Sequence, residues 1–201
     1  MKKKKIIALL MGIVLALGVS ITGCSNGNSN SGQSGEQHLQ GEAKAEPVPD
    51  LKAFEAKTLD GNTFTQDDIA KKDVTVINFW STMCGPCIDE MPDIARFAKS
   101  LPKNVEMLTV CLDGGEDTEL VKQLLKEAGY EGTTLLSGTG DFKNISDSIQ
   151  YTPTTIVVDR DGTMSGEALI GGQEDLEKVY TEMVNNALKV MGKAEITDGK
   201  N

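Results

Sequence analysis

Histidine is nearly absent from this 201-residue sequence, because His38 is the only one. A zinc site needs about four ligands drawn from cysteine, histidine and carboxylate side chains. The sequence has four cysteines, of which Cys84 and Cys87 form the sole Cys-X-X-Cys pair, and His38 lies far from this pair along the chain. These shortages argue against a metal site, and we expect neither a metal nor another cofactor.

Long apolar runs are also absent, apart from Ile6–Leu17 near the start of the chain. A helix that spans a membrane needs about 20 apolar residues, so this run is short for a permanent span. It follows the basic residues Lys2–Lys5 and precedes Ile21-Thr22-Gly23-Cys24, which is the layout of a secretory signal peptide. We therefore predict that residues 1–23 are a signal peptide.

The residues around Cys24 resemble the bacterial lipobox, in which the cysteine is diacylated and becomes the mature N-terminus. Cys24 is thus the predicted lipidation site, and the protein is expected on the extracytoplasmic face of a bacterial cell membrane. The alternative is an ordinary signal peptide with a chance cysteine near its cleavage site. Export permits disulfide chemistry, but the three cysteines left after Cys24 are too few for a scaffold held by disulfides.

Composition divides the remaining chain into three parts. Residues 24–49 are mostly Ser, Asn, Gly, Gln and Glu, a composition typical of a flexible tether. Residues 50–190 are long enough for one domain with its own core. Residues 191–201 form a predicted polar tail.

Basic residues are outnumbered, with 20 lysines and arginines against 30 acidic residues. Loss of Lys2–Lys5 with the signal peptide leaves 16 basic residues and a formal charge of −14. This charge balance argues against binding to nucleic acid and against adhesion to an anionic lipid surface. Acidity spread over a surface mainly favours solubility.

Hydrophobic periodicity predicts alternating strands and helices between residues 54 and 190. Strands are expected at 54–58, 63–65, 74–80, 105–112, 133–136, 154–158 and 163–170, and helices at 84–101, 117–130, 141–149 and 176–188. The Asp60-Gly61 and Asp161-Gly162 pairs predict hairpin turns. This order of elements predicts an α/β sandwich with a mixed sheet.

The Cys84-Gly85-Pro86-Cys87 segment lies between a predicted buried strand and the helix that follows it. Cysteines two residues apart can close a disulfide with little backbone movement. At the start of a helix, free N–H groups and the helix dipole favour a thiolate, so Cys84 is the predicted nucleophile and Cys87 the thiol that completes the exchange. Gly85 allows close backbone approach, and Pro86 is tolerated in the first turn. Half of a zinc site and a purely structural disulfide are the alternatives.

The segment Phe79-Trp80-Ser81-Thr82-Met83-Cys84-Gly85-Pro86-Cys87, with Pro92 and the downstream Tyr151-Thr152-Pro153-Thr154, resembles the thioredoxin superfamily. The N-terminal hairpin, the extra helix and strand between about 116 and 136 and the export signal make the chain similar to the TlpA and ResA group of extracytoplasmic thioredoxin-like lipoproteins. The resemblance covers residues 50–190. It implies a thioredoxin fold, with a mixed central sheet flanked by helices, an N-terminal β-hairpin and a central helix–strand insertion.

The resemblance also implies a substrate-binding surface beside the cysteines. Pro153 matches the family's cis proline, which leaves Thr152 free to pair with an extended substrate; a proline at a strand edge without this role is the alternative. Met83 stands where family members commonly have tryptophan, so the usual rigid docking surface becomes a flexible thioether. We therefore expect Met83, Gly85, Pro86, Thr152 and Pro153 to contact substrate.

Four further residues are predicted to lie near the cysteines. Glu90 follows Cys87 by three residues and matches a family glutamate that tunes thiol acidity, so it is expected to raise a cysteine pKa or to accept the Cys87 proton; an exposed helix carboxylate is the alternative. Asn78 replaces the buried aspartate of thioredoxins proper, as is usual in the TlpA and ResA group, and an amide cannot relay a proton. Cys111 is expected to be a small buried hydrophobe, with a third redox thiol as the alternative. Trp80 is expected in the core.

The implied function is that of a membrane-anchored thiol:disulfide oxidoreductase outside the cytoplasm. The Cys-Gly-Pro-Cys sequence is that of reducing thioredoxins, which favours reduction of disulfides in exported proteins such as apocytochrome c or a methionine sulfoxide reductase, with electrons from a transmembrane thiol carrier. An oxidant or isomerase of the same fold is the main alternative, because potentials in this fold span about 150 mV. A non-catalytic binding lipoprotein is a third reading. The sequence lacks the Cys-X-X-X-Cys spacing and distant histidine of copper-insertion proteins, and Ser81-Thr82-Met83-Cys84 only approximates a peroxidase loop.

Overall fold

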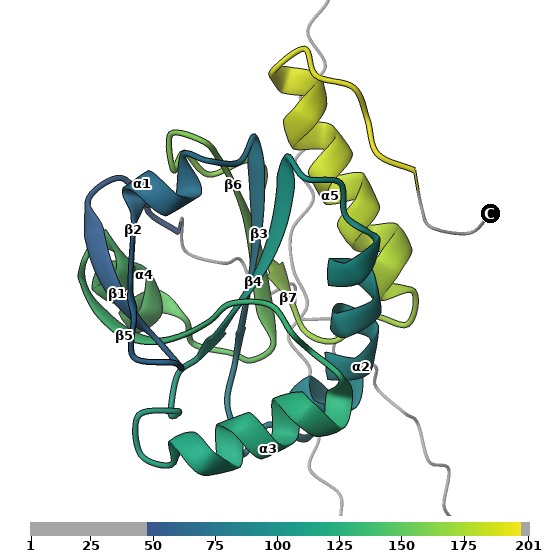
Figure 1. Cartoon of the computed structure of the whole chain (residues 1–201). Coiled ribbons are helices and arrows are strands. Elements are labelled where there is room, and N and C mark those ends of the chain that lie inside the picture. The colour runs from purple at the N-terminus through teal and green to yellow at the C-terminus, as the bar shows by residue number, and fades with distance from the viewer. Residues whose placement is uncertain (1–47, 198–201) are drawn as a thin grey trace, which may run out of the picture. The chain divides into compact units, whose positions relative to one another are not determined.

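The computed structural model describes residues 48–197 (Figure 1). The predicted signal peptide, Cys24, nearly all of the predicted tether and residues 198–201 lie outside this range. Within it the strands form one seven-stranded mixed sheet in the order β2-β1-β5-β4-β3-β6-β7. The strands are β1 (Phe54–Thr58), β2 (Thr63–Thr65), β3 (Val74–Trp80), β4 (Val105–Cys111), β5 (Thr134–Gly140), β6 (Thr154–Asp159) and β7 (Leu169–Ile170). The helices are α1 (Gln66–Ile69), α2 (Gly85–Ser100), α3 (Thr118–Ala128), α4 (Asp141–Ser148) and α5 (Leu176–Val190).

Strand β3 lies at the centre of the core, and all seven of its residues are buried. It pairs in parallel with β4 and antiparallel with β6, and Phe79 lies opposite Thr154. Trp80 faces one hydrophobic cluster together with side chains of α2, α3 and α5, whereas Phe79 faces a second cluster that includes residues of α4. Figure 1 shows α2 and α5 on one side of the sheet and α1 and α4 on the other. A strand covered on both faces is mostly apolar, as the sequence predicts, and its buried polar residues are Thr75 and Asn78.

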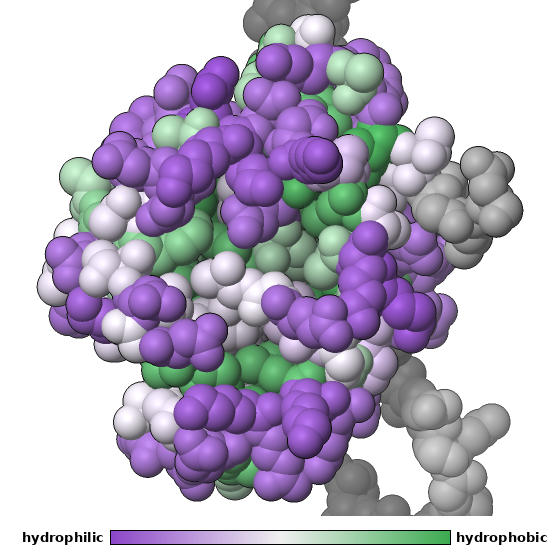
Figure 2. Space-filling view, viewed as in Figure 1, coloured by the Kyte–Doolittle hydropathy of each residue, from purple (hydrophilic) through white to green (hydrophobic). Residues whose placement is uncertain are grey.

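Local signals set the limits of the helices. Helix α2 begins after Cys84 and continues through Pro92. Helix α3 begins at the Asp117 side chain, which accepts the Leu120 N–H at 3.0 Å, and it ends at Gly129, whose φ of 72° is in the left-handed region. Figure 2 shows hydrophilic residues over the outer surface of α3 and apolar residues in the furrow between α3 and the sheet. Helix α3 and strand β5 together form the predicted central insertion.

The returning strand expected at 163–170 is shorter than the sequence suggested. Only Leu169–Ile170 pairs as β7, and Met164 makes an isolated bridge to Val158. The Met164 N–H, which faces away from β6, is donated to the Asp50 carboxylate at 3.0 Å. Gly166, with φ of 80°, then turns the chain before β7. A contact with a residue 114 positions away cannot be seen in a local pattern.

Two smaller differences concern β5 and α1. Strand β5 extends to Gly140 because it pairs antiparallel with β1, with Gly138 opposite Ala56. A side chain at position 138 would meet the Glu55 carbonyl oxygen 2.5 Å away. The short helix α1, which the sequence did not predict, begins with a capping box formed by Thr65 and Asp68. Among residues 48–197, no helix has both the length and the apolarity needed to cross a membrane.

Candidate active site

The structure joins Cys84 and Cys87 in a disulfide at the point where β3 ends and α2 begins, and their Cα atoms are 5.3 Å apart. Cys84 is the N-cap residue of α2, and its Sγ accepts the Cys87 N–H at 3.3 Å. Cys84 is half-buried, whereas Cys87 is fully buried. A partner molecule can therefore reach the first sulfur but not the second.

The start of α2 favours negative charge on Cys84. The positive end of the helix dipole and the Cys87 N–H both stabilise a thiolate relative to a thiol. The first turn of α2 carries no acidic side chain that would oppose this charge. Gly85 and Pro86 are exposed beside the disulfide, and Met83 is the most exposed large hydrophobic residue of this loop, at 88 %.

The Thr152–Pro153 peptide bond is cis, as the resemblance implied. Because Phe79 lies opposite Thr154, the register of β3 and β6 brings Pro153 to the end of the sheet that carries the disulfide. Pro153 is buried and its carbonyl oxygen accepts the Gly171 N–H at 2.8 Å, whereas Thr152 is half-buried. The two predicted elements of the substrate-binding surface thus lie at the same end of the sheet.

Glu90 is buried in the second turn of α2, with only 8 % of its surface exposed, so it is not an exposed helix carboxylate. Burial raises its pKa to about 7, although hydrogen bonds from the Asn78 amide and the Gln173 backbone N–H oppose this rise. The Asn78 Nδ2 atom lies 3.3 Å from Glu90 Oε1. A carboxyl with such a pKa can both take up and release a proton near neutral pH.

A sequence model of the family described as Redoxin matches residues 43–180. The chain belongs to the redoxin family. Among its relatives, a thiol-disulfide oxidoreductase ResA of Bacillus cereus is 32 % identical over 133 residues, which cover 62 % of this chain and 70 % of that protein. The thioredoxin-like protein YneN of Bacillus subtilis (strain 168) is 27 % identical over 155 residues, which cover 77 % of this chain and 85 % of that protein. This redoxin is therefore ResA-like.

Solved structures confirm the predicted fold of this redoxin. StoA from Bacillus subtilis is similar with a TM-score of 0.54 and 23 % identity, over 68 % of this chain and 99 % of that one. The exposed lipoprotein thioredoxin of Streptococcus pneumoniae strain TIGR4 is similar with a TM-score of 0.52 and 23 % identity, over 66 % of this chain and 98 % of that one. At these identities the likeness establishes the thioredoxin fold alone.

A polar cluster that sequence reasoning missed lies beneath Glu90 in this redoxin. Asn78 Nδ2 is 3.0 Å from Thr155 Oγ1 and 3.3 Å from the Tyr180 hydroxyl, and these two oxygens are 2.7 Å apart. Tyr180 is buried, and burial raises the pKa of its hydroxyl. The only sequence signals were a threonine in an apolar strand and a tyrosine on the apolar face of a helix. The cluster fixes the Asn78 amide, which in turn contacts Glu90.

Asp113 is a second residue that sequence reasoning missed. Its carboxylate accepts the Thr82 N–H at 2.9 Å and the Thr82 hydroxyl at 2.7 Å, so it holds the loop that leads to Cys84. The Cys111 thiol donates to the same carboxylate at 3.2 Å. Cys111 is fully buried, and burial raises the pKa of its thiol, which favours the neutral thiol over the thiolate. Cys111 therefore packs as the buried hydrophobe that the sequence predicted.

Replacing Asp113 by alanine is expected to destabilise the protein by about 2 kcal/mol, because hydrogen bonds to a charged group contribute roughly 1.5–3 kcal/mol. Denaturant unfolding of the oxidised protein measures this change. The exposed Asp89, which follows Cys87 by two residues, provides the matched control, and its replacement by alanine should shift stability by less than about 0.5 kcal/mol. Equal effects of the two substitutions would show that Asp113 does not hold the loop.

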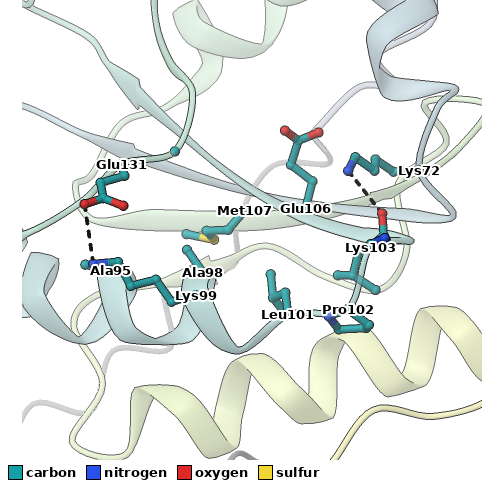
Figure 3. Close-up of a pocket in the computed structure, with 12 residues that line it drawn as sticks. Lys72, Ala95, Ala98, Lys99, Leu101, Pro102, Lys103, Glu106, Met107 and Glu131 are labelled. Atoms are coloured by element: carbon teal, nitrogen blue, oxygen red, sulfur yellow. Dashed lines mark hydrogen bonds and ion pairs between the residues drawn. The ribbon is translucent and has the colours of Figure 1, made fainter.

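A cavity beside the end of α2 and the start of β4 is shown in Figure 3, and it lies at the opposite end of the sheet from the disulfide. It has a volume of about 310 Å³. Its charged side chains are Lys72, Lys99, Lys103, Glu106 and Glu131. Within residues 48–197 no group of three histidine, cysteine or acidic side chains is arranged to hold a metal ion.

Proposed function

We propose that this ResA-like thiol–disulfide oxidoreductase is anchored outside the cytoplasm and reduces disulfides of exported proteins through Cys84 and Cys87. The observation that carries the proposal is the position of the disulfide at the start of α2, where one cysteine is half-buried and the other fully buried. That arrangement suits a reachable nucleophile followed by a protected second thiol. A purely structural disulfide would gain nothing from this difference in access.

The first step links the substrate covalently to the enzyme. The Cys84 thiolate attacks one sulfur of the substrate disulfide, the substrate S–S bond breaks, and a mixed disulfide with Cys84 forms. The second substrate sulfur leaves as a thiolate and takes a proton from solvent. Met83, Thr152 and Pro153 border the disulfide end of the sheet and are proposed to hold the substrate chain during this step.

The second step releases the reduced substrate. Glu90 accepts the Cys87 proton, and the Cys87 thiolate attacks Cys84 Sγ. The Cys84–Cys87 bond forms, the mixed disulfide breaks, and the remaining substrate sulfur leaves as a thiolate and is protonated. Two electrons and two protons have then passed to the substrate. Glu90 suits this role because its pKa of about 7 leaves part of the population ionised at neutral pH.

The proposed partners follow from the export signal and the cysteine chemistry. The substrates are exported proteins with disulfides, among which apocytochrome c and a methionine sulfoxide reductase are candidates. A transmembrane thiol carrier would return two electrons to the Cys84–Cys87 disulfide. Acylated Cys24 would hold the protein at the membrane; this residue lies outside the described part of the chain. The signal-peptide layout before Cys24 supports the anchor.

The reduction potential of the Cys84–Cys87 couple tests the direction of electron flow. We expect a value near that of thioredoxin, about −270 mV, rather than near that of strong oxidants, about −120 mV. A strong oxidant needs a highly stabilised thiolate, but residues 81–90 include no lysine, arginine or histidine, and they include Asp89 and Glu90. Equilibration of the full chain in dithiothreitol redox buffers, followed by alkylation of free thiols, measures the potential. A value near −120 mV would favour the disulfide-forming oxidant instead.

A further inference from the structure

Two exposed apolar side chains border the disulfide in the structure. In residues 48–197 the exposed large hydrophobic residues are Met83 at 88 %, Tyr151 at 57 % and Val190 at the end of α5. Met83 follows β3 and directly precedes Cys84, and Tyr151 precedes β6 next to Thr152. Since β3 and β6 are paired neighbours, both side chains lie at the disulfide end of the sheet. Apolar residues gathered at one exposed place mark an interaction surface.

Acidic residues surround this end of the sheet without a single basic residue among them. The connecting segments that meet there are 81–90, 112–118, 149–154 and 169–176, and none of them contains lysine, arginine or histidine. Together they contain seven acidic residues: Asp89, Glu90, Asp113, Glu116, Asp117, Glu174 and Asp175. Of these, Asp89, Glu116, Asp117, Glu174 and Asp175 are exposed.

The opposite end of the sheet carries charges of both signs. Lys72, Lys99 and Lys103 line the cavity there together with Glu106 and Glu131 (Figure 3). The four segments at the disulfide end therefore carry acidic residues without basic ones, unlike the opposite end, where both signs occur. Carboxylates gathered at one place attract cations and repel anions over about 10 Å at physiological ionic strength.

We propose that the disulfide end binds a basic and apolar segment of its protein substrate, in which an apolar residue and lysine or arginine residues lie close to the reacting cysteine. The proposal rests on the proposed function and adds a substrate class to it. The apolar residue of the substrate packs against the Met83 thioether, which adapts to different shapes. A lysine or arginine lies over the Tyr151 ring and faces the carboxylates of Glu116 and Glu174. The electron transfer itself is the exchange described above.

Three synthetic peptides, each with one disulfide, test this preference. They differ only in four flanking residues, which are lysine, glutamate or glutamine, and each is mixed with the reduced full chain. We expect the lysine peptide to react about tenfold faster than the glutamate peptide at low ionic strength, and the ratio to approach about two at 0.5 M salt, because salt screens charges at an exposed surface. Equal rates for the lysine and glutamate peptides would overturn the proposed preference. No reaction with the glutamine peptide would instead overturn the proposed function.

Charge-reversal variants distinguish the effect of the carboxylates near the disulfide from the effect of the protein's net charge. The double substitution Glu116→Lys and Glu174→Lys should invert the order of the lysine and glutamate peptides. The matched control is Glu127→Lys with Glu131→Lys, which changes the net charge equally at exposed positions in the last turn of α3 and just after it. The control should keep the order of the original chain. If both double variants change the peptide ratio equally, net charge explains the preference and no local surface exists.

A second pair of peptides tests whether the apolar side chains of this surface contact the substrate. One lysine peptide carries leucine and the other carries serine beside the cysteine. The Met83→Ser and Tyr151→Ser substitutions should each reduce the ratio of the leucine-peptide rate to the serine-peptide rate about threefold. An unchanged leucine advantage in both variants would show that these two side chains do not contact the substrate.

Discussion

Replacing Cys84 by serine is expected to lower the rate of disulfide reduction by the full chain at least about 1,000-fold, because Cys84 is the only cysteine among residues 48–197 that is not fully buried. Cys87 cannot take its place, since it is fully buried beneath the helix start. Cys111 cannot do so either, because it is buried and its pKa is raised. The rate of insulin reduction with dithiothreitol as electron donor measures this loss.

Two further cysteine variants make the test specific. Cys111→Ala should keep most of the activity, because Cys111 is fully buried and donates a hydrogen bond to Asp113. Cys87→Ala should accumulate mixed disulfides on Cys84, and in cells these should be recovered from the membrane fraction with exported proteins attached. Substantial activity of Cys84→Ser would show that another cysteine begins the exchange.

Glu90→Gln is expected to remove a large pH dependence from the stability of the protein. Burial raises the Glu90 pKa from its ordinary value of 4.5 to about 7. Between these two values the folded protein holds a proton that the unfolded chain has lost, so stability falls as pH rises through this window. At about 1.4 kcal/mol per pH unit, the wild-type protein loses on the order of 3 kcal/mol, and the loss is complete above pH 7. An amide at this position does not titrate.

Unfolding by denaturant between pH 4 and pH 8.5 measures this effect with the disulfide closed. The stability of Glu90→Gln relative to wild type should increase from pH 4.5 to pH 7 and stay constant above it. The difference between the two proteins cancels the contribution of other titrating groups, such as the half-buried Glu106. A difference that does not change with pH would show that Glu90 has an ordinary pKa in the folded protein. In the same variant, release of substrate from the mixed disulfide should slow at neutral pH if Glu90 accepts the Cys87 proton.

The parts of the fold that local pattern determines were predictable. The nearly continuous apolar run at 74–80 predicted a strand covered on both faces, and a Cys-X-X-Cys pair soon after such a strand indicates a redox site at a helix start. The positions of Glu90 and Pro153 relative to the cysteines followed from the resemblance, because the chain order of a known fold places them. The roles of these residues in catalysis remain predictions.

What could not be predicted depends on contacts between distant parts of the chain. Asp113 and Thr82 are 31 residues apart, and Asn78 and Tyr180 are 102 residues apart. Neither pair leaves a periodic signal, since each side chain fits the pattern of its own element. The hydrogen bond from the Met164 N–H to Asp50 likewise joins residues 114 positions apart. The clustering of acidic residues also became visible only when the topology brought four connecting segments together.

The hydrogen bonds between Asp113 and Thr82 allow two neighbouring residues to serve separate functions. Met83 is proposed to contact the substrate, and Cys84 to carry out the disulfide exchange. Thr82 is fixed on one side of Met83, and the helix start fixes Cys84 on the other. Position 83 is therefore free to change in shape without moving the sulfur next to it. A change of the side chain at position 83 can therefore alter which substrates bind, while the exchange chemistry at Cys84 stays as it was.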